Sequence, residues 1–264
     1  HVILSQFLIK FPKASFFQIS HNTALYLKDF GLYLSQMGHE EWLNIQQEKF
    51  TWSTHKSIRR SVRKAKKSHI CIKESLLSDI DTSLLWDIHK KWCNTRTNKS
   101  YYQSFLTRPL ILKNEPDVRY FFAYQGSTLI GYKFFYPLYR QNRIFGYYDD
   151  ITRYIPSAPP STSYLLFYEA LSQFKKEGIQ ALSLGLNYRP SFTPIFPSYL
   201  DSFFSFIFKF SSPFYNLKGI SHHKRRFHAT PLPVFFASSY QFPFLDFSFS
   251  AIKTLNLLQT RHFL

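Results

Sequence analysis

The stretch "RYFFAYQGSTLIGYKFFYPLYRQNRIFGYYDDI", residues 119–151, decides the fold. It contains three runs rich in aromatic and aliphatic residues, separated by Gln125–Gly126 and by residues 140–142. Such runs favour strands, and a Gly or Asn between two of them is typical of a hairpin. The stretch therefore predicts an antiparallel meander of three strands.

Helix and strand signals continue on both sides of the meander. Upstream we expect a strand at 14–20, a helix at 21–31 that ends at Gly31, and two strands, "LYLSQMG" and "EWLNIQQ", joined by a turn at Gly38 and His39. The first part of the chain is therefore rich in strands.

The segments next to the meander alternate between helix and strand. Before it we expect a strand at 69–74, a helix at 79–93 and a short helix at 101–112; after it, a helix at 161–176 and a strand at 179–187. This order resembles that of a Gcn5-related N-acetyltransferase unit, and the first part resembles an incomplete copy. The resemblance implies an α+β fold of two fused units, each with a mixed, mostly antiparallel sheet flanked by helices.

The segment "HKSIRRSVRKAKK", residues 55–67, carries seven Lys or Arg residues and no acid. Ile58, Val62 and Ala65 are spaced to share one face of a helix, for which Ser53 or Thr54 supplies the N-cap. The outer face is either a contact for RNA or another polyanion, or only a solvated surface. The candidate contact residues are Lys56, Arg59, Arg60, Arg63 and Lys67.

Composition restricts the partners and the compartment. The chain has 33 Lys and Arg against 16 Asp and Glu, a net charge of +17, which attracts RNA or anionic lipid headgroups, although basicity for solubility alone stays open. With 45% hydrophobic residues, a disordered chain is excluded. Cys71 and Cys93 are too few for a disulfide scaffold and lack zinc-site spacing, so we expect reduced thiols and no metal.

The termini bear on the relation to the membrane. Because the chain begins with His1, we expect it to be part of a longer protein, in which membrane spans can lie upstream. The apolar window 232–252 is interrupted by Asp246 and by prolines, and predicts no transmembrane helix. The Phe-rich segment 235–249 either packs in the core or lies on a membrane surface.

Residues 145–160, "FGYYDDITRYIPSAPP", carry the most specific motif. Asp150, Arg153 and Tyr154, followed by Pro156 and Pro159, resemble the segment D-L-M-R-Y-R-P-x-x-P in the C-terminal domain of bacterial phosphatidylglycerol lysyltransferases. That family transfers an amino acid from aminoacyl-tRNA to a lipid.

The resemblance continues in register over residues 20–238. "KDFGLYLSQMGHEEWLNI" is similar to the family's first strand pair, "GIQALSLGLNY" to its strand ending L-G-M-A-P, and "LKGISHHKRRFHATPLPVFFA" to its closing segment. The family fold implies a partial N-terminal unit over 1–75, including the basic helix at 54–68, and a C-terminal unit over 76–264.

The resemblance implies roles for the motif residues. Asp150 would bind the amino group of the aminoacyl moiety or act as the base, and Arg153 would orient the substrate or the ester. Alternation along a strand points Asp149 to the opposite face. The alternative is an Asp–Arg pair that only stabilises a loop.

The closing segment supplies further substrate-binding candidates: Asn187 at the mouth of the cleft, and Lys224, Arg226 and His228. Alternation would place the last three on one side of an extended strand, as contacts for phosphate or acyl ester; a solvated turn is the alternative. The chain has Thr162-Ser163-Tyr164 where the family has an acid. The loss of that carboxylate makes lysine a doubtful donor residue.

The predicted function is transfer of an aminoacyl group from aminoacyl-tRNA to a lipid such as phosphatidylglycerol, on the cytoplasmic face of the membrane. Two alternatives remain: an inactive homologue that binds RNA or anionic membrane, and an acyl-CoA-dependent N-acyltransferase. Acetyl-CoA is disfavoured because the loop "PSAPPSTS", residues 156–163, has three prolines and no glycine to offer backbone amides to a pyrophosphate. We therefore expect no cofactor other than the tRNA-bound donor.

Overall fold

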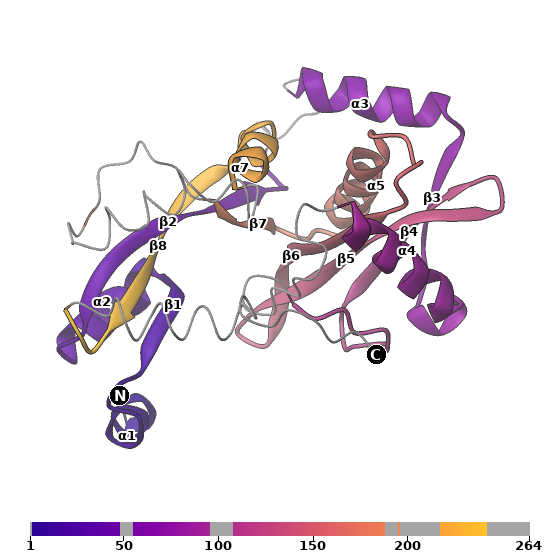
Figure 1. The fold of residues 1–264 in the computed structure, drawn as a ribbon. Coiled ribbons are helices and arrows are strands. Elements are labelled where there is room, and N and C mark those ends of the chain that lie inside the picture. The colour runs from indigo at the N-terminus through magenta and orange to yellow at the C-terminus, as the bar shows by residue number, and fades with distance from the viewer. Residues whose placement is uncertain (1, 48–54, 96–107, 188–194, 196–216, 242–264) are drawn as a thin grey trace.

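The chain forms one eight-stranded, largely antiparallel sheet with the strand order β1-β8-β2-β7-β6-β5-β4-β3, flanked by helices (Figure 1). The structure is a computed structural model that describes residues 2–47, 55–95, 108–187, 195 and 217–241. The α+β fold predicted from the sequence is confirmed. The elements are α1 (Val2–Lys10), β1 (Ser15–Ser20), α2 (His21–Asp29), β2 (Tyr33–Asn44), α3 (Lys56–Lys67), β3 (Ile70–Glu74), η1 (Leu77–Asp79), α4 (Thr82–Asn94), β4 (Arg119–Gln125), β5 (Thr128–Arg140), β6 (Arg143–Tyr154), α5 (Thr162–Lys176), β7 (Ala181–Asn187), α7 (Leu217–Arg225) and β8 (Thr230–Ser238).

The meander is confirmed as β4, β5 and β6, paired antiparallel. Gly126 turns the first hairpin with a φ of 61°, and Gln141 and Asn142 turn the second with φ of 50° and 59°. A positive φ at the first central residue of the first hairpin, and at both central residues of the second, matches the twist of the strands, and Gly126 and Asn142 adopt such a φ readily.

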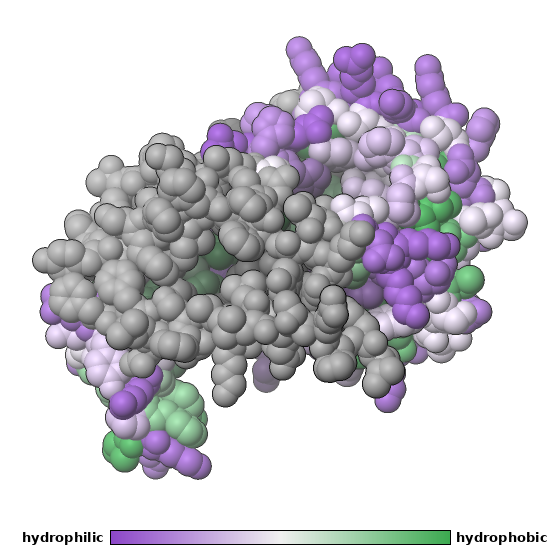
Figure 2. Space-filling view, in the orientation of Figure 1, coloured by the Kyte–Doolittle hydropathy of each residue, from purple (hydrophilic) through white to green (hydrophobic). Residues whose placement is uncertain are grey.

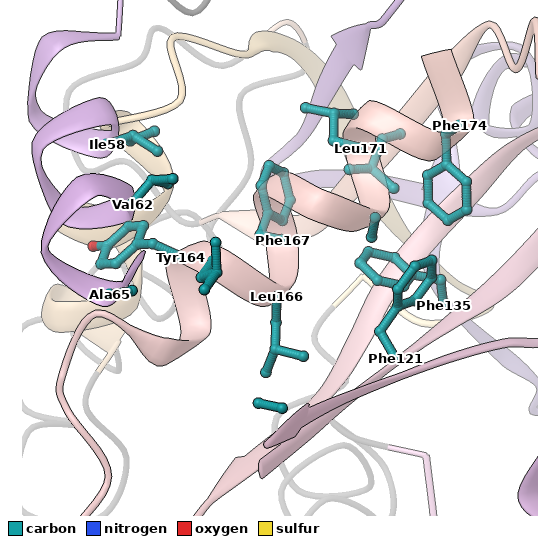
Figure 3. Packing of buried hydrophobic residues seen from close by; sticks show 14 of the residues in the cluster. Ile58, Val62, Ala65, Phe121, Phe135, Tyr164, Leu166, Phe167, Leu171 and Phe174 are labelled. Atoms are coloured by element: carbon teal, nitrogen blue, oxygen red, sulfur yellow. The ribbon is translucent and has the colours of Figure 1, made fainter. Parts of the chain in front are cut away.

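One face of the meander packs against α5. Phe174 stacks on Tyr147 with ring centroids 4.5 Å apart, and it meets Phe121 and Phe135 edge to face (Figure 3). Phe174 is fully buried. Because aromatic pairs prefer these geometries, the phenylalanines of the meander fix α5 across the strands.

Helix α3 covers the outer side of α5. Ile58 and Ala65 are fully buried and Val62 is nearly so, and all three face α5 beside Tyr164 (Figure 3). The amphipathic helix predicted from the spacing is confirmed. Its N-cap is His55, which is buried and whose Nε2 lies 2.9 Å from the carbonyl oxygen of Phe227; Ser53 and Thr54 lie outside the described residues.

The opposite face of the meander carries α4. Leu85 and Ile88 pack there with Tyr120, Phe122 and Phe134, and the Tyr132 hydroxyl donates to the carbonyl oxygen of Leu85 at 3.3 Å. The sheet is therefore covered on both faces in its C-terminal half.

The remaining part of the sheet differs from the prediction in one respect. The turn expected at Gly38 and His39 is wrong, because β2 runs unbroken from Tyr33 to Asn44. Its register against β8 shifts between Gln36 and Gly38, so the glycine accommodates a bulge within one strand. Since β8 lies between β1 and β2, the end of the described chain completes the first half of the sheet; the unit boundary at residue 75 stays a prediction.

Three other sequence predictions are resolved in part. Of the helix expected at 101–112, the described residues 108–112 are not helical, and the rest lies outside the described residues. Phe235 and Phe236 are buried in β8, as the core alternative for 235–249 predicts, whereas 242–249 lie outside the described residues. Within the described residues, no helix is long and apolar enough to cross a membrane.

Candidate active site

The middle of the sheet contains the only parallel strand pair among the described strands, and this pair separates. β6 and β7 are paired at Gly146–Tyr148 and Ala181–Ser183, although the strands continue to Tyr154 and Asn187. Two glycines permit this geometry. A Cβ on Gly146 would lie 2.6 Å from the carbonyl oxygen of Ala181, and one on Gly185 would lie 2.5 Å from the Tyr148 hydroxyl. Beyond Tyr148, β6 presents residues 149–153 where it no longer pairs with β7.

Asp149 points to the α5 side of the sheet and pairs with a lysine. Lys133 Nζ lies 2.6 Å from Asp149 Oδ1 and donates to Thr152 Oγ1 at 2.6 Å. The Lys133 side chain is 6% exposed, and its ammonium group also lies over the rings of Phe135 and Phe167. A charge this buried is tolerated because its partners compensate it.

Asp150 points to the α4 side, so the two neighbouring carboxylates face opposite ways, as alternation predicts. The register between β5 and β6 shifts beside Asp150, which makes it the extra residue of a bulge. Burial raises the pKa of Asp150 to about 6, while the charge of Arg153 and a hydrogen bond from the backbone N–H of Arg108 oppose the rise. A carboxyl with this pKa can accept a proton near neutral pH.

Arg153 is positioned by α4. Its guanidinium carbon lies 3.8 Å from the ring centroid of Trp92, and its Nε lies 3.4 Å from Nδ1 of His89. Burial, together with the charge of Arg153, lowers the pKa of His89 to about 4, so the imidazole is neutral and can accept from the guanidinium. Arg153 is thus a fixed cation within electrostatic reach of Asp150.

Two acids of β2 face β7. Ser183 Oγ donates to Glu40 Oε1 at 2.5 Å, and Asn187 Nδ2 donates to Glu41 Oε1 at 2.7 Å. Glu41 and Asn187 are buried. The Asn187 side chain predicted at the mouth of a cleft therefore holds a buried carboxylate next to the separating strands.

Lys224 joins this acidic centre from the last turn of α7. Its Nζ donates to the carbonyl oxygen of Leu186 at 2.7 Å, an oxygen on the part of β7 that no longer pairs with β6. Desolvation lowers the pKa of Lys224 to about 8, although Asp149 and Glu41 act in the opposite direction. The ammonium group therefore stays mainly protonated at neutral pH, although its pKa lies below that of an ordinary lysine.

The other two residues predicted beside Lys224 lie elsewhere. Arg226 donates to the hydroxyl of Tyr164, and the His228 ring lies 5.4 Å from that of His55. The expectation of an extended strand is wrong, because Leu217–Arg225 form α7 and residues 226–228 a turn. The sequence period here is that of a helix, so side chains two residues apart do not share a face.

The outer face of α3 carries cations that lie away from this centre. Among the described residues, Lys66 is the only cation of this helix in an ion pair, with Glu169 at 3.0 Å. Arg60 and Arg63 are exposed and Arg59 is partly exposed. α3 forms the upper right edge of the molecule in Figure 1, and Figure 2 shows that the surface there is hydrophilic.

Sequence reasoning missed Lys133, Tyr164 and His223. Lys133 carries a detectable signal, since it is the one charge within the aromatic run "LIGYKFFYPL" at 129–138. Tyr164 and His223 carry none: their contact, 2.9 Å from the Tyr164 hydroxyl to His223 Nδ1, joins residues 59 positions apart. Among the described residues, no group of three His, Cys, Asp or Glu side chains is placed to hold a metal ion.

Comparison with known proteins assigns the chain to a family. The family model for the C-terminal domain of phosphatidylglycerol lysyltransferase matches residues 9–238. The chain belongs to this family.

Solved structures share the fold of this lysyltransferase-family domain at low identity. The C-terminal domain assigned to a lysylphosphatidylglycerol synthetase of Agrobacterium fabrum is 17% identical with a TM-score of 0.68, covering 97% of this chain and 75% of that one. L-PGS from Bacillus licheniformis is 14% identical with a TM-score of 0.69, covering 94% and 73%. FemX is 8% identical with a TM-score of 0.50, covering 89% and 74%. No curated protein matches by sequence.

At the start of α5, the resemblance described in the sequence analysis predicts that an acid of the family is missing. Thr162 stands there, and its hydroxyl donates to the carbonyl oxygen of Pro159 at 2.7 Å, which closes the first turn. Tyr164 meets His223 and Arg226. The hydroxyls of Thr162 and Tyr164, in the segment where that acid is expected, therefore form hydrogen bonds within the chain.

Proposed function

We propose that this chain transfers an aminoacyl group from aminoacyl-tRNA to the hydroxyl of a membrane lipid such as phosphatidylglycerol. The observation that carries the proposal is Asp150, a carboxyl with a pKa near 6 beside the fixed guanidinium of Arg153, at the place where β6 and β7 separate. Membership of the lysyltransferase family supports the reaction class.

Asp150 acts as the base in this proposal. It takes the proton of the lipid hydroxyl while that oxygen attacks the acyl carbon of the ester, and the bond from that carbon to the ribose oxygen then breaks. The proton passes to the departing ribose oxygen, so the exchange of one ester for another balances. Arg153 orients the ester, and Lys224 places positive charge near the oxygen on which negative charge develops.

The donor is aminoacyl-tRNA rather than acyl-CoA. Two backbone N–H groups of the loop between β6 and α5 already donate within the loop: that of Ala158 to the carbonyl oxygen of Ile155, and that of Thr162 to the carbonyl oxygen of Pro159. The prolines at 156, 159 and 160 have no N–H to offer. A pyrophosphate would meet few free amides here.

The acceptor lies in an anionic membrane. α1 exposes Ile3 and Ile9, at 84% and 80%, and exposes Phe7 in part; Phe11, directly after α1, is also partly exposed, and Lys10 and Lys13 are close by in the sequence. Figure 2 shows this apolar surface at the tip of the molecule that α1 forms. Apolar side chains beside cations are typical of helices that lie on anionic lipid surfaces.

The test is a transfer assay with radiolabelled aminoacyl-tRNAs and phosphatidylglycerol vesicles, with acetyl-CoA as a competing donor. Asp150→Asn should lower the rate of lipid aminoacylation by about 10²- to 10⁴-fold. Asp87→Asn, which changes an exposed carboxylate of α4, is the control and should keep the rate.

A result without lipid product from any aminoacyl-tRNA, with RNA and vesicles still bound, would contradict the transferase proposal. It would favour the inactive binding module. Product formed only from acetyl-CoA would favour the N-acyltransferase.

A further inference from the structure

A pocket of about 270 Å³ opens where the start of α5 meets α3 and the turn after α7. It lies outside the group of acids at the centre of the sheet. Three cations and no acid line it, which is the charge balance of an anion site. The lining residues are Arg60, Ser61, Lys64, Pro160, Ser161, Tyr164 and Arg226.

Ser161 gives the pocket an unsatisfied donor. The residue is 5% exposed, and its Oγ has no hydrogen-bond partner within the described part of the chain. A buried hydroxyl without a partner costs about 1–3 kcal/mol, which a ligand oxygen would relieve. Ser161 also precedes the first residue of the 15-residue helix α5, whose positive dipole end favours an anion.

Arg226 is fixed at the mouth of the pocket. Its Nη1 donates to the Tyr164 hydroxyl and its Nε to Ser57 Oγ at 3.4 Å, which leaves Nη2 for a ligand. Arg60 and Lys64 are exposed on α3 and form no ion pair with any described residue. α3 and the turn after α7 thus present one hydrogen-bonded cation, Arg226, and two exposed cations to the same space.

We propose that this pocket binds one backbone phosphodiester of an RNA strand. That the RNA is the tRNA donor rests on the function proposed above. The cations of α3 continue from the pocket along one helix of 12 residues, roughly 18 Å long, as a polyanion would need.

An RNA phosphate suits this pocket better than a membrane lipid does. The exposed apolar side chains of α1 lie at the other end of the molecule from α3 (Figures 1 and 2). A membrane seated on α1 would therefore leave the pocket in water. A strand lying along α3 would instead place a phosphate directly over Arg60 and Lys64.

The pocket is connected to the acidic centre. Tyr164, which lines it, contacts His223, and the charges of Lys133 and Asp149 act on that imidazole. A phosphate held here would lie on the α5 side of the sheet, linked through Tyr164 and His223 to the Lys133–Asp149 pair, and it would fix the position of the strand that carries the ester.

The experiment measures binding of uncharged RNA, so it does not depend on transfer. Hairpins with a single-stranded 3′ end, each with one neutral methylphosphonate in place of a phosphate, are titrated against the chain by fluorescence anisotropy. For the wild type, a methylphosphonate at one position should weaken binding about tenfold, and at every other position much less. In Lys64→Gln that position should cost less than about twofold, and the matched control Lys67→Gln, on the same helix but outside the pocket, should keep the tenfold loss.

Ser161 provides a second pair of variants. Ser161→Asp places a carboxylate in the pocket and should abolish the position-specific loss, whereas Ser161→Ala should only reduce it. The proposal is overturned if no phosphate position stands out, or if Lys64→Gln and Lys67→Gln behave alike. It is also overturned, in favour of a lipid phosphate, if Lys64→Gln weakens binding to phosphatidylglycerol vesicles but not to RNA. A position-specific phosphate effect without lipid aminoacylation would refute the proposed function and leave this pocket assigned.

Discussion

Lys133 and the outer cations of α3 carry the same charge in opposite surroundings. Lys133 is 6% exposed and is held by Asp149 and Thr152, whereas Arg63 and Lys67 project into water without an ion pair to a described residue. Lys133 is part of the packed sheet, so removing its charge or that of Asp149 changes the free energy of unfolding. The exposed cations of α3 act through an electrostatic field that salt screens, so removing them changes the affinity for anionic partners rather than stability.

The largest expected effect comes from breaking the buried pair. Asp149→Asn leaves Lys133 charged and unpaired, and should lower the free energy of unfolding by about 3–5 kcal/mol. Urea unfolding measures this loss.

The double variant Lys133→Met with Asp149→Leu is the control for the buried pair, because it removes both charges and should restore most of the stability. A single variant as stable as wild type would contradict the pairing.

The next largest effect is the pH dependence of stability that comes from Asp150, the neighbour of Asp149. The folded pKa of Asp150 is about 6 against an ordinary 3.8, so the folded state binds more protons between these values. Stability should therefore fall as pH rises from about 4 to about 6, by roughly 3 kcal/mol in total, and change no further above pH 7. Asp150→Asn should lack this component. Thermal unfolding of both proteins at pH 4, 5, 6 and 7 tests it, and parallel pH profiles would show that Asp150 titrates normally.

A smaller effect is expected on the inner face of α3. Ile58→Val removes one methylene from a fully buried side chain and should cost about 0.5–1.5 kcal/mol of stability. RNA affinity should stay within twofold of wild type, because the outer face is unchanged. Denaturant unfolding and anisotropy titration on the same sample check both expectations; a large loss of RNA affinity would mean that the two faces are not independent.

The smallest effect on stability is expected on the outer face. Replacing Arg59, Arg63 and Lys67 together with Gln should change the free energy of unfolding by less than about 0.5 kcal/mol per site. RNA binding should weaken, with the slope of log affinity against log salt reduced by up to about two units. An unchanged slope would mean that the outer face of α3 does not contact RNA and is only a solvated surface.

Much of the fold could be predicted because its signals are local. Aromatic runs separated by turn residues predicted the meander, and helical spacing predicted a helix at 161–176, observed as α5, and the buried stripe of α3; the resemblance to the lysyltransferase family supplied the topology. The bulge at Gly38 was read as a turn, since a glycine serves either geometry and only the pairing of β2 with β8 decides between them.

The candidate site was predictable only in part. Asp150 and Arg153 follow from the motif, and the opposite orientation of Asp149 follows from strand alternation. The partner of Asp149 does not, because Lys133 meets it through the register of β5 and β6. Similarly, Lys224 reaches the carbonyl oxygen of Leu186, 38 positions away, only because Leu217–Arg225 fold as a helix rather than a strand.

By itself, the sequence determined the α+β class, the order of the meander, the amphipathic helix and the family, since these depend on neighbours in the chain and on residue order. The tertiary structure decided which charges meet. It placed β8 between β1 and β2, let β6 and β7 separate after Tyr148, and brought α3, α5 and the turn after α7 around Ser161. The physical reason is that the pKa of a group and the strength of an ion pair depend on burial and on partners distant in the chain, which no local pattern records.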